Sequence, residues 1–290
     1  DYNAPGKDIT FVINELAGLG DINGLPGFED ATPDLIEAVI EEAARLANGV
    51  LSPLNQSGDA SGSRVEDKKV IPAKGFADIY KAFKEGGWPA LPFGPERGGQ
   101  GLPELVATAC NEIWQAANMA FALCPMLTEG AAVAIDAHAS DELKDIFLAN
   151  MISGEWSGTM NLTEPQAGSD LAAVKTRAEP EGDHYLLSGQ KIFITNGGIA
   201  DIYTVFAKLD DGFAAFLVEK EMNGFSIGKE ENKLGLRGSS TTTLFFDDIK
   251  IPKKNLLYLE GEGHHVALTA LDVGRFDLAA AFLGEAKYNL

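Results

Sequence analysis

The chain has 290 residues, a length that suggests about two domains and is sufficient for a large hydrophobic core without disulfides or structural metals. Hydrophobic residues make up 45% and charged residues 23%, as in an ordinary soluble globular protein. Against 43 Asp and Glu stand 23 Lys and Arg, which gives a formal net charge of -20. This acidity argues against a nucleic-acid-binding protein or one that rides on anionic membranes, because both need a basic surface.

The cysteines and histidines indicate a protein without disulfides or metal. Both cysteines lie in apolar stretches without a CxxC pattern, so we interpret them as buried thiols of a cytoplasmic protein. The four histidines lack zinc-ligand spacing, and the adjacent pair is expected to point in different directions on a helix. We therefore expect no metal site. We also expect no membrane span and no signal peptide. The residues concerned are Cys110, Cys124, His138, His184, His264 and His265.

The first half of the chain is predicted to be helical. Thr32 and Pro33 begin a helix whose apolar stripe runs to Leu46, with Gly49 as its expected end. Further helices are expected over 76–85, from about Pro103 through residue 114, over 127–137, and after Ser140. The polar segment 57–69 reads as a surface loop or as an excursion between two helices.

The pattern changes to short, alternating strands from Trp156 to about Pro252. Turns are expected at 181–183 and 210–212. A helical pattern returns after 261–263 and is still running at Leu290, with an apolar face that needs partners. Strands that do not alternate with helices exclude a doubly wound parallel sheet. The fold class is α+β: a helical N-terminal domain, an antiparallel β middle domain and the start of a C-terminal helical bundle. We expect boundaries at 1–74, 75–156, 157–257 and 258–290.

Several common catalytic motifs are absent. The sequence contains no GxGxxG, GxxxxGK[ST] or GxSxG, which removes the best signals for a Rossmann nicotinamide site, a P-loop and a nucleophile-elbow hydrolase.

The segment 160–170, MNLTEPQAGSD, is the richest in chemistry. Gly168 admits a ligand close to the backbone, while Thr163 and Ser169 offer hydroxyl groups. Taken alone, the segment fits a capped turn equally well.

The segment 191–198, KIFITNGG, reads as a strand. Alternation places Ile192 and Ile194 on one face and Phe193 and Thr195 on the other, where an aromatic ring and a hydroxyl suit a flat heteroaromatic ring such as a flavin. Taken alone, it also fits a core strand. Asp272 and Arg275 share one helix face and form either a surface ion pair or a phosphate- and amide-binding pair.

Together these segments resemble the acyl-CoA dehydrogenase family. Two further segments, LGLRGSS at 234–240 and FDDIKIP at 246–252, are similar to later motifs of its β domain. The opening, YNAP at 2–5 and DITFV at 8–12, resembles longer bacterial members, among them methylthiopropanoyl-CoA dehydrogenases. The β domain is more similar to long-chain members, so the acyl substrate stays open.

The resemblance implies an FAD wedged between the domains and an acyl-CoA substrate oxidised to the trans-2-enoyl-CoA. Ser169 would also meet the substrate, and Asp272 and Arg275 would hold its CoA portion. Phe193 would take the aromatic position, usually Trp, and Thr195 would bond the N5/O4 edge of the flavin. An electron-transfer flavoprotein would accept the electrons, and the assembly would be a homodimer or homotetramer. The cofactor-binding residues implied are Met160, Leu162, Thr163, Gly168, Ser169, Phe193, Ile194 and Thr195.

The catalytic base has no assignment. In most relatives it comes from a later helical bundle, and in a minority it directly precedes the helix Arg, where this chain has Gly274. We therefore expect the native chain to continue past Leu290. The alternatives are an acyl-CoA oxidase, or a flavin-binding relative without catalysis that acts as a scaffold or stress-response protein.

Overall fold

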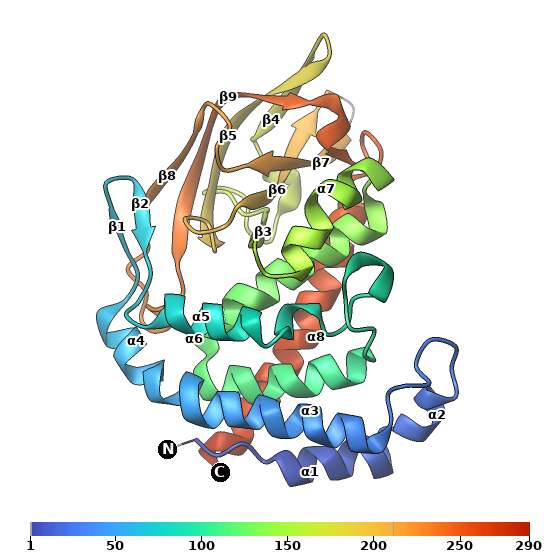
Figure 1. The fold of residues 1–290 in the computed structure, drawn as a ribbon. Coiled ribbons are helices and arrows are strands. Elements are labelled where there is room, and N and C mark those ends of the chain that lie inside the picture. The colour runs from blue at the N-terminus through green and yellow to red at the C-terminus, as the bar shows by residue number, and fades with distance from the viewer. Residues whose placement is uncertain (1, 211) are drawn as a thin grey trace.

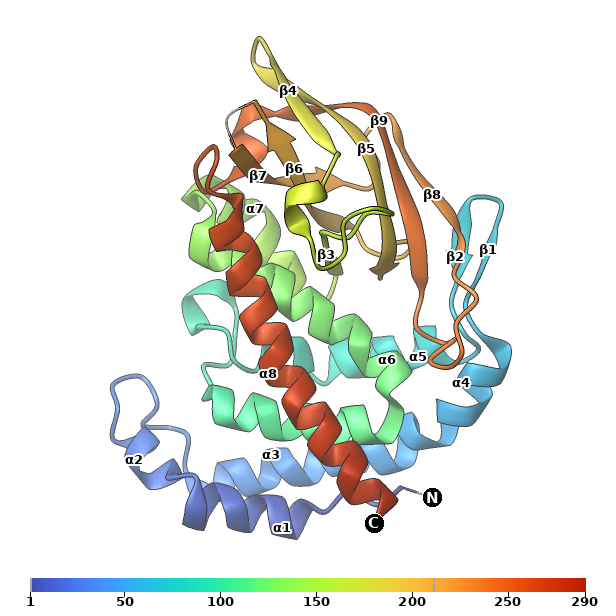
Figure 2. The ribbon, with the colours of Figure 1, turned by 180° about the vertical axis from the view of Figure 1, so that it is seen from behind.

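A computed structural model describes residues 2–210 and 212–290. Helices form one end of the molecule and a β-sheet the other, and the long C-terminal helix α8 (Gly263–Asn289) runs between them along helix α6 (Glu104–His138), as both Figure 1 and Figure 2 show. The two ends of the chain lie close together, where Tyr2 and Tyr288 pack edge to face with ring centroids 5.5 Å apart. The expected α+β class is confirmed.

The N-terminal helices follow the caps that the sequence carries. Thr32 Oγ1 accepts a hydrogen bond from the Leu35 amide at 3.4 Å, and Pro33 occupies the first helical position of α3. Gly49 does not end this helix as expected, because the chain continues through a π-turn over Ala47–Leu51. The other helices here are α1 (Gly6–Phe11), α2 (Leu19–Asn23), α3 (Pro33–Leu46), α4 (Asn55–Ser61), α5 (Phe76–Glu85) and α7 (Asp141–Ile152).

The segment 57–69 is not a surface loop; its second half belongs to an excursion between helices α4 and α5, the other arrangement that its polarity allows. It forms most of α4 and enters a hairpin of β1 (Arg64–Glu66) and β2 (Lys69–Ile71). Contacts with a distant part of the chain hold it in place. Asp59 pairs with the Arg237 guanidinium, and Ser63 Oγ donates to the Gly238 carbonyl at 2.8 Å. Partners about 175 residues away leave no local signal in the sequence.

Helix α6 joins two segments that the sequence suggests as separate helices. Its interruption lies at Asn118, which has φ -161° and ψ 83°. By length and composition α6 could cross a membrane, contrary to our expectation that no segment could. However, 61% of its most apolar 18-residue stretch is buried within the fold, as in a core helix.

The sheet has the strand order β10-β7-β6-β4-β5-β9-β8, and β3 pairs with β6. Its pairings are antiparallel except those of β3 and β4 with β6, which are parallel. The turn at 181–183 separates β4 from β5 as expected, whereas the turn at 210–212 includes residue 211, outside the described residues. The strands are β3 (Gly158–Asn161), β4 (Arg177–Glu181), β5 (His184–Thr195), β6 (Ile202–Leu209), β7 (Gly212–Glu219), β8 (Phe225–Glu230), β9 (Thr241–Pro252) and β10 (Leu256–Leu257).

Helix α8 packs on α6 through small side chains. Gly284 lies so close that a Cβ there would come within 2.6 Å of the Glu112 carbonyl oxygen. Larger apolar side chains on α8 are exposed, which agrees with the expectation that this helix leaves an apolar face uncovered. These side chains are Leu268, Phe276, Phe282 and Leu283.

The break in α6 gives a test of the fold. Asn118 is fully buried; its Nδ2 donates to the Leu51 carbonyl at 3.1 Å and its Oδ1 accepts from the Phe121 amide at 3.2 Å. Asn118→Ala leaves both backbone groups without a partner, so we expect it to lower the free energy of unfolding by about 2–4 kcal/mol. Chemical denaturation followed by circular dichroism measures this loss. Asn150→Ala, at a solvent-facing position of α7, is the control, and an equal loss there would contradict the interpretation.

Candidate functional site

The predicted flavin loop follows β3 and begins with a tight turn. Glu164 and Ala167 exchange backbone hydrogen bonds of 2.9 and 3.0 Å. Beyond this turn Gly168 and Ser169 are exposed, and a Cβ at Gly168 would meet no atom within 4 Å. The backbone at Gly168 and the side chain of Ser169 are therefore accessible to a ligand.

The predicted flavin strand ends in a bulge, so the strict alternation that we expected does not hold. Lys191 pairs with Leu244 and Ile194 with Thr242, which leaves one extra residue on β5 between them. Lys191 is fully buried, although alternation would place it on the same face as Phe193. Phe193 adopts a left-handed backbone conformation (φ 56°) and is 60% exposed. A bulky residue held in this conformation is typical of a functional site.

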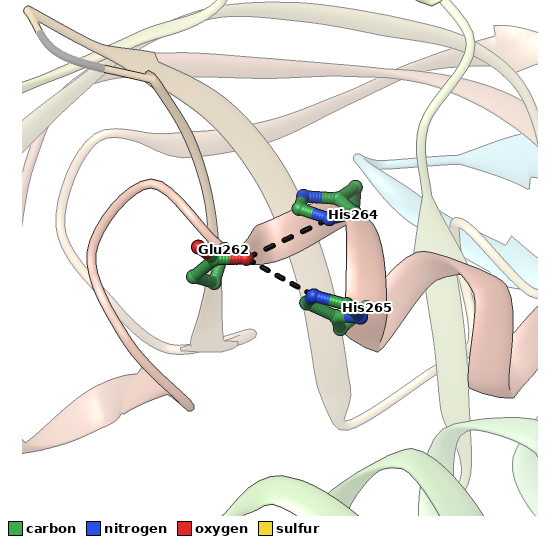
Figure 3. A group of neighbouring side chains, drawn as sticks. All are labelled: Glu262, His264 and His265. Atoms are coloured by element: carbon green, nitrogen blue, oxygen red, sulfur yellow. Dashed lines mark ion pairs between the residues drawn. The ribbon is translucent and has the colours of Figure 1, made fainter.

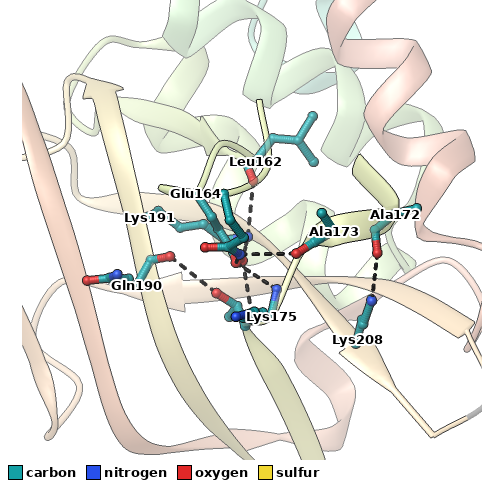
Figure 4. A network of polar contacts seen from close by, with 10 residues as sticks. Leu162, Glu164, Ala172, Ala173, Lys175, Gln190, Lys191 and Lys208 are labelled. Atoms are coloured by element: carbon teal, nitrogen blue, oxygen red, sulfur yellow. Dashed lines mark hydrogen bonds and ion pairs between the residues drawn. The ribbon is translucent and has the colours of Figure 1, made fainter. Parts of the chain in front are cut away.

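The loop and the strand lie against each other. The Ile192 amide donates to the Thr163 carbonyl at 2.9 Å, and Lys191 Nζ donates to the Leu162 carbonyl at 3.2 Å (Figure 4). Thr159 on β3 donates its hydroxyl to the Thr195 carbonyl at 2.7 Å. These bonds hold the loop residues 162–163 against the C-terminal part of β5.

A buried ion pair lies beneath this junction. Lys191 Nζ is 2.8 Å from Glu164 Oε1. Burial alone would raise the pKa of Glu164, but hydrogen bonds from Lys191 and the backbone near Lys175 and Thr176 outweigh it and lower the pKa to about 2. Burial lowers the pKa of Lys191 to about 8, and its bond to Glu164 opposes that shift. At neutral pH both groups are ionised.

Asp272 and Arg275 form the surface pair that the sequence allows. Arg275 Nη1 lies 3.1 Å from Asp272 Oδ1, and both side chains are mostly exposed on α8. One residue before Arg275, a Cβ at Gly274 would meet no atom within 4 Å. The cations and acceptors proposed for CoA are thus accessible.

A buried acid on α8 and a partly buried acid on α6 were not recognised as a pair from the sequence. Asp277 is fully buried; it accepts from Asn111 Nδ2 at 3.0 Å, and burial together with Glu104 raises its pKa to about 6. Burial and the charge of Asp277 also raise the pKa of Glu129. A signal was present, since Asp277 falls on the helical stripe of Ala270, Ala280, Ala281 and Gly284.

The histidine pair corrects our expectation that its side chains diverge. The rings of His264 and His265 lie 4.1 Å apart, and their Nε2 atoms are 3.6 and 3.1 Å from Glu262 Oε2 (Figure 3). Both histidines lie in the first turn of α8, and the carboxylate that they share, Glu262, is at the N-cap position just before it. The three donor atoms lie within 4.8 Å of one another, close enough to share a cation, although both rings are half exposed.

A separate cavity of about 280 Å³ lies between α5, α6 and the sheet. It is mostly apolar, and none of the predicted site residues line it. Cys124 borders it and is only partly buried, unlike Cys110, so our expectation of two buried thiols is wrong for Cys124. Its surroundings nevertheless raise its pKa to about 12, so it is an unreactive thiol. Other lining residues include Tyr80, Phe121, Ser157, Asn196 and Ser240.

Comparisons with known proteins agree with this arrangement. The profile of the acyl-CoA dehydrogenase N-terminal domain matches residues 36–155, and that of the middle domain matches residues 159–249. The chain is 37% identical over 268 residues to 3-methylmercaptopropionyl-CoA dehydrogenase of Ruegeria pomeroyi, covering 85% of this chain and 46% of that protein. It is 41% identical over 213 residues to a short-chain-specific acyl-CoA dehydrogenase of Clostridium acetobutylicum, covering 71% and 56%.

Solved structures give the same result. Butyryl-CoA dehydrogenase of Megasphaera elsdenii superposes with a TM-score of 0.79 at 32% identity, covering 88% of this chain and 66% of that one. Acyl-CoA dehydrogenase of Bacillus anthracis, complexed with FAD, gives 0.78 at 30% identity, covering 87% and 42%. The chain thus spans between 42% and 66% of the length of these relatives. On both domain profiles and these relatives, the chain belongs to the acyl-CoA dehydrogenase family, whose members are oxidoreductases.

Proposed function

We propose that this chain provides the FAD-binding face of an enzyme that dehydrogenates an acyl-CoA thioester between its α and β carbons. The observation that carries the proposal is the junction of the 160–169 loop with the strained end of β5. There Phe193 is exposed, and its neighbour Ile192 is bonded to the loop at Thr163. The same loop carries the open backbone of Gly168 and the exposed Ser169. FAD is the group that fits this chemistry, because a large flat ring needs an apolar surface and polar partners along its edge.

The residues of this chain would bind and orient both ligands. The Phe193 ring would pack against the flavin plane, and the Thr195 hydroxyl would donate to its polar edge. The open backbone at Gly168 and the Ser169 hydroxyl would bond the ribityl-phosphate chain. When bound, FAD would accept the hydride that leaves the substrate β carbon. Arg275 would bind the anionic CoA portion, with Asp272 accepting from its amides.

The electron acceptor belongs to the same proposal. One structural neighbour is named as an electron transferring flavoprotein of Acidaminococcus fermentans; it has 35% identity and a TM-score of 0.78 and covers 86% of this chain. This likeness supports a protein acceptor over oxygen. Measuring oxygen uptake beside reduction of an electron-transfer flavoprotein separates a dehydrogenase from an oxidase. A cytoplasmic location and a homodimer or homotetramer complete the proposal, and light scattering tests the assembly.

We expect the native protein to carry FAD. Denaturing it should release a chromophore with the mass of FAD, and Thr195→Val should raise the FAD dissociation constant about fivefold, since one hydrogen bond is worth about 1 kcal/mol. Thr243→Val on the neighbouring strand β9 is the control. A protein that holds no flavin even after incubation with FAD would refute the assignment.

We expect Arg275→Ala to weaken acyl-CoA binding at least tenfold while leaving the FAD content unchanged. A charge-assisted hydrogen bond contributes about 1.5–3 kcal/mol. Titration calorimetry with an acyl-CoA measures the change. Arg45→Ala removes a comparable exposed i,i+3 ion pair on α3, with Glu42, and should have no effect. A loss of FAD without a change in acyl-CoA affinity would show that the role is misassigned.

We expect residues 1–290 alone to show no acyl-CoA turnover with an artificial electron acceptor. The reaction needs a carboxylate poised at the substrate α carbon. Glu164 is committed to its buried ion pair, and Gly274 offers no carboxylate beside Arg275. Dye reduction by the 290-residue chain is the measurement. Turnover by these residues would instead direct the search for the base to Glu129 and Asp277.

A further inference from the structure

Glu164 connects three segments of the chain at the edge of the proposed flavin site. Its Oε1 accepts from Lys191 Nζ at 2.8 Å and from the Thr176 amide at 3.0 Å. Its Oε2 accepts from the Lys175 amide and from Gln166 Nε2, both at 2.6 Å. Figure 4 shows this carboxylate and the Lys191 ammonium facing each other between the loop and strand β5. The loop, the start of β4 and the end of β5 are thereby fixed to one another.

The ion pair is costly to bury, so stability alone is a poor reason for it. The side chains of Lys191 and Glu164 are 0% and 2% exposed. The attraction between two buried charges offsets their lost hydration only when the geometry is good and further hydrogen bonds are made. Proteins in which such a pair is replaced by apolar residues are often no less stable. What a buried pair can add is a defined geometry for the backbone that carries it.

The backbone that Lys191 carries is the strained one. Lys191 is the last residue in register with β9 before the bulge, and Ile194 is the next. Between them Phe193 holds its left-handed conformation, which persists only when the surroundings over-determine it. On the near side of the bulge, the Lys191 side chain is fixed by Glu164 and the Leu162 carbonyl, and the Ile192 amide by the Thr163 carbonyl.

We propose that Lys191 and Glu164 are positioning residues that set the conformation of the β5 bulge, and through it the placement of Phe193 and Thr195 against the flavin ring. The inference rests on the proposed function for its ligand. The pair itself lies beneath the loop and would touch neither ligand. Its effect would pass through two covalent neighbours, Ile192 and Thr163, whose backbone groups it holds at hydrogen-bonding distance.

The experiment compares Lys191→Met, Glu164→Gln, the double variant and Lys191→Arg in the native protein incubated with FAD. We expect each to raise the FAD dissociation constant about tenfold and to change the visible circular dichroism of bound flavin. The double variant leaves no buried charge, so it should recover stability in chemical denaturation without recovering the flavin signal. Lys208→Met is the control, because this lysine also donates to a loop carbonyl, that of Ala172 at 2.7 Å, but is exposed (Figure 4).

A second readout needs no flavin. Hydrogen exchange at the Ile192 amide should accelerate at least tenfold in the double variant and in Lys191→Arg, and should stay unchanged in Lys208→Met. Unchanged Ile192 exchange, or wild-type FAD affinity and flavin dichroism in the folded double variant and in Lys191→Arg, would overturn the inference. Should the wild-type protein bind no FAD while Ile192 exchange still responds, the proposed ligand would be wrong and the positioning role of the pair would stand.

Discussion

The buried carboxylate of Glu164 is the point on which the geometry of the candidate site depends. It accepts hydrogen bonds from one cation and three further donors. Lys191, Thr176 and Lys175 lower its pKa to about 2 despite its burial. Asp277, equally buried on α8, has Asn111 as a donor, but burial and the charge of Glu104 raise its pKa to about 6. The two acids show the opposite results of removing a charge from water. One anchors a loop as a permanent anion, whereas the other takes up a proton close to neutral pH.

The strain at Phe193 follows from how this anchor is used. A regular strand would place Lys191 and Phe193 on the same face, so a buried ion pair would draw the aromatic ring inward with it. The bulge separates the two outcomes: the lysine enters the core and the ring stays exposed. The left-handed conformation costs on the order of 1–3 kcal/mol, which the surrounding hydrogen bonds must offset. This combination explains why a β-strand can present a large apolar surface at its end.

Sequence patterns predicted those features whose causes are local. The caps at Thr32 and Ser140 act within three residues, and both accept the expected amide hydrogen bonds. The motifs around Thr163 and Thr195 identified the family, because the order of residues within each motif is itself the resemblance. The hairpin within 57–71 could not be foreseen, since its support comes from Arg237 and Gly238. Nor could the β5 bulge, because the run of Lys191 to Thr195 contains no Gly or Pro that would mark an irregular strand.

The two proposed binding regions are stabilised by different kinds of interaction. The flavin side is fixed by buried hydrogen bonds and an ion pair within the sheet. Binding of the flavin ring would therefore cost little entropy, because the loop and strand are already ordered. The CoA side rests on Asp272 and Arg275, whose exposed pair contributes about 0–1 kcal/mol and opens at little cost. A charge-assisted bond to a ligand exceeds that value, so Arg275 can exchange its partner. A rigid binding site for the flavin suits a cofactor that stays bound. A cation that can change its partner suits a substrate that binds and dissociates in each turnover.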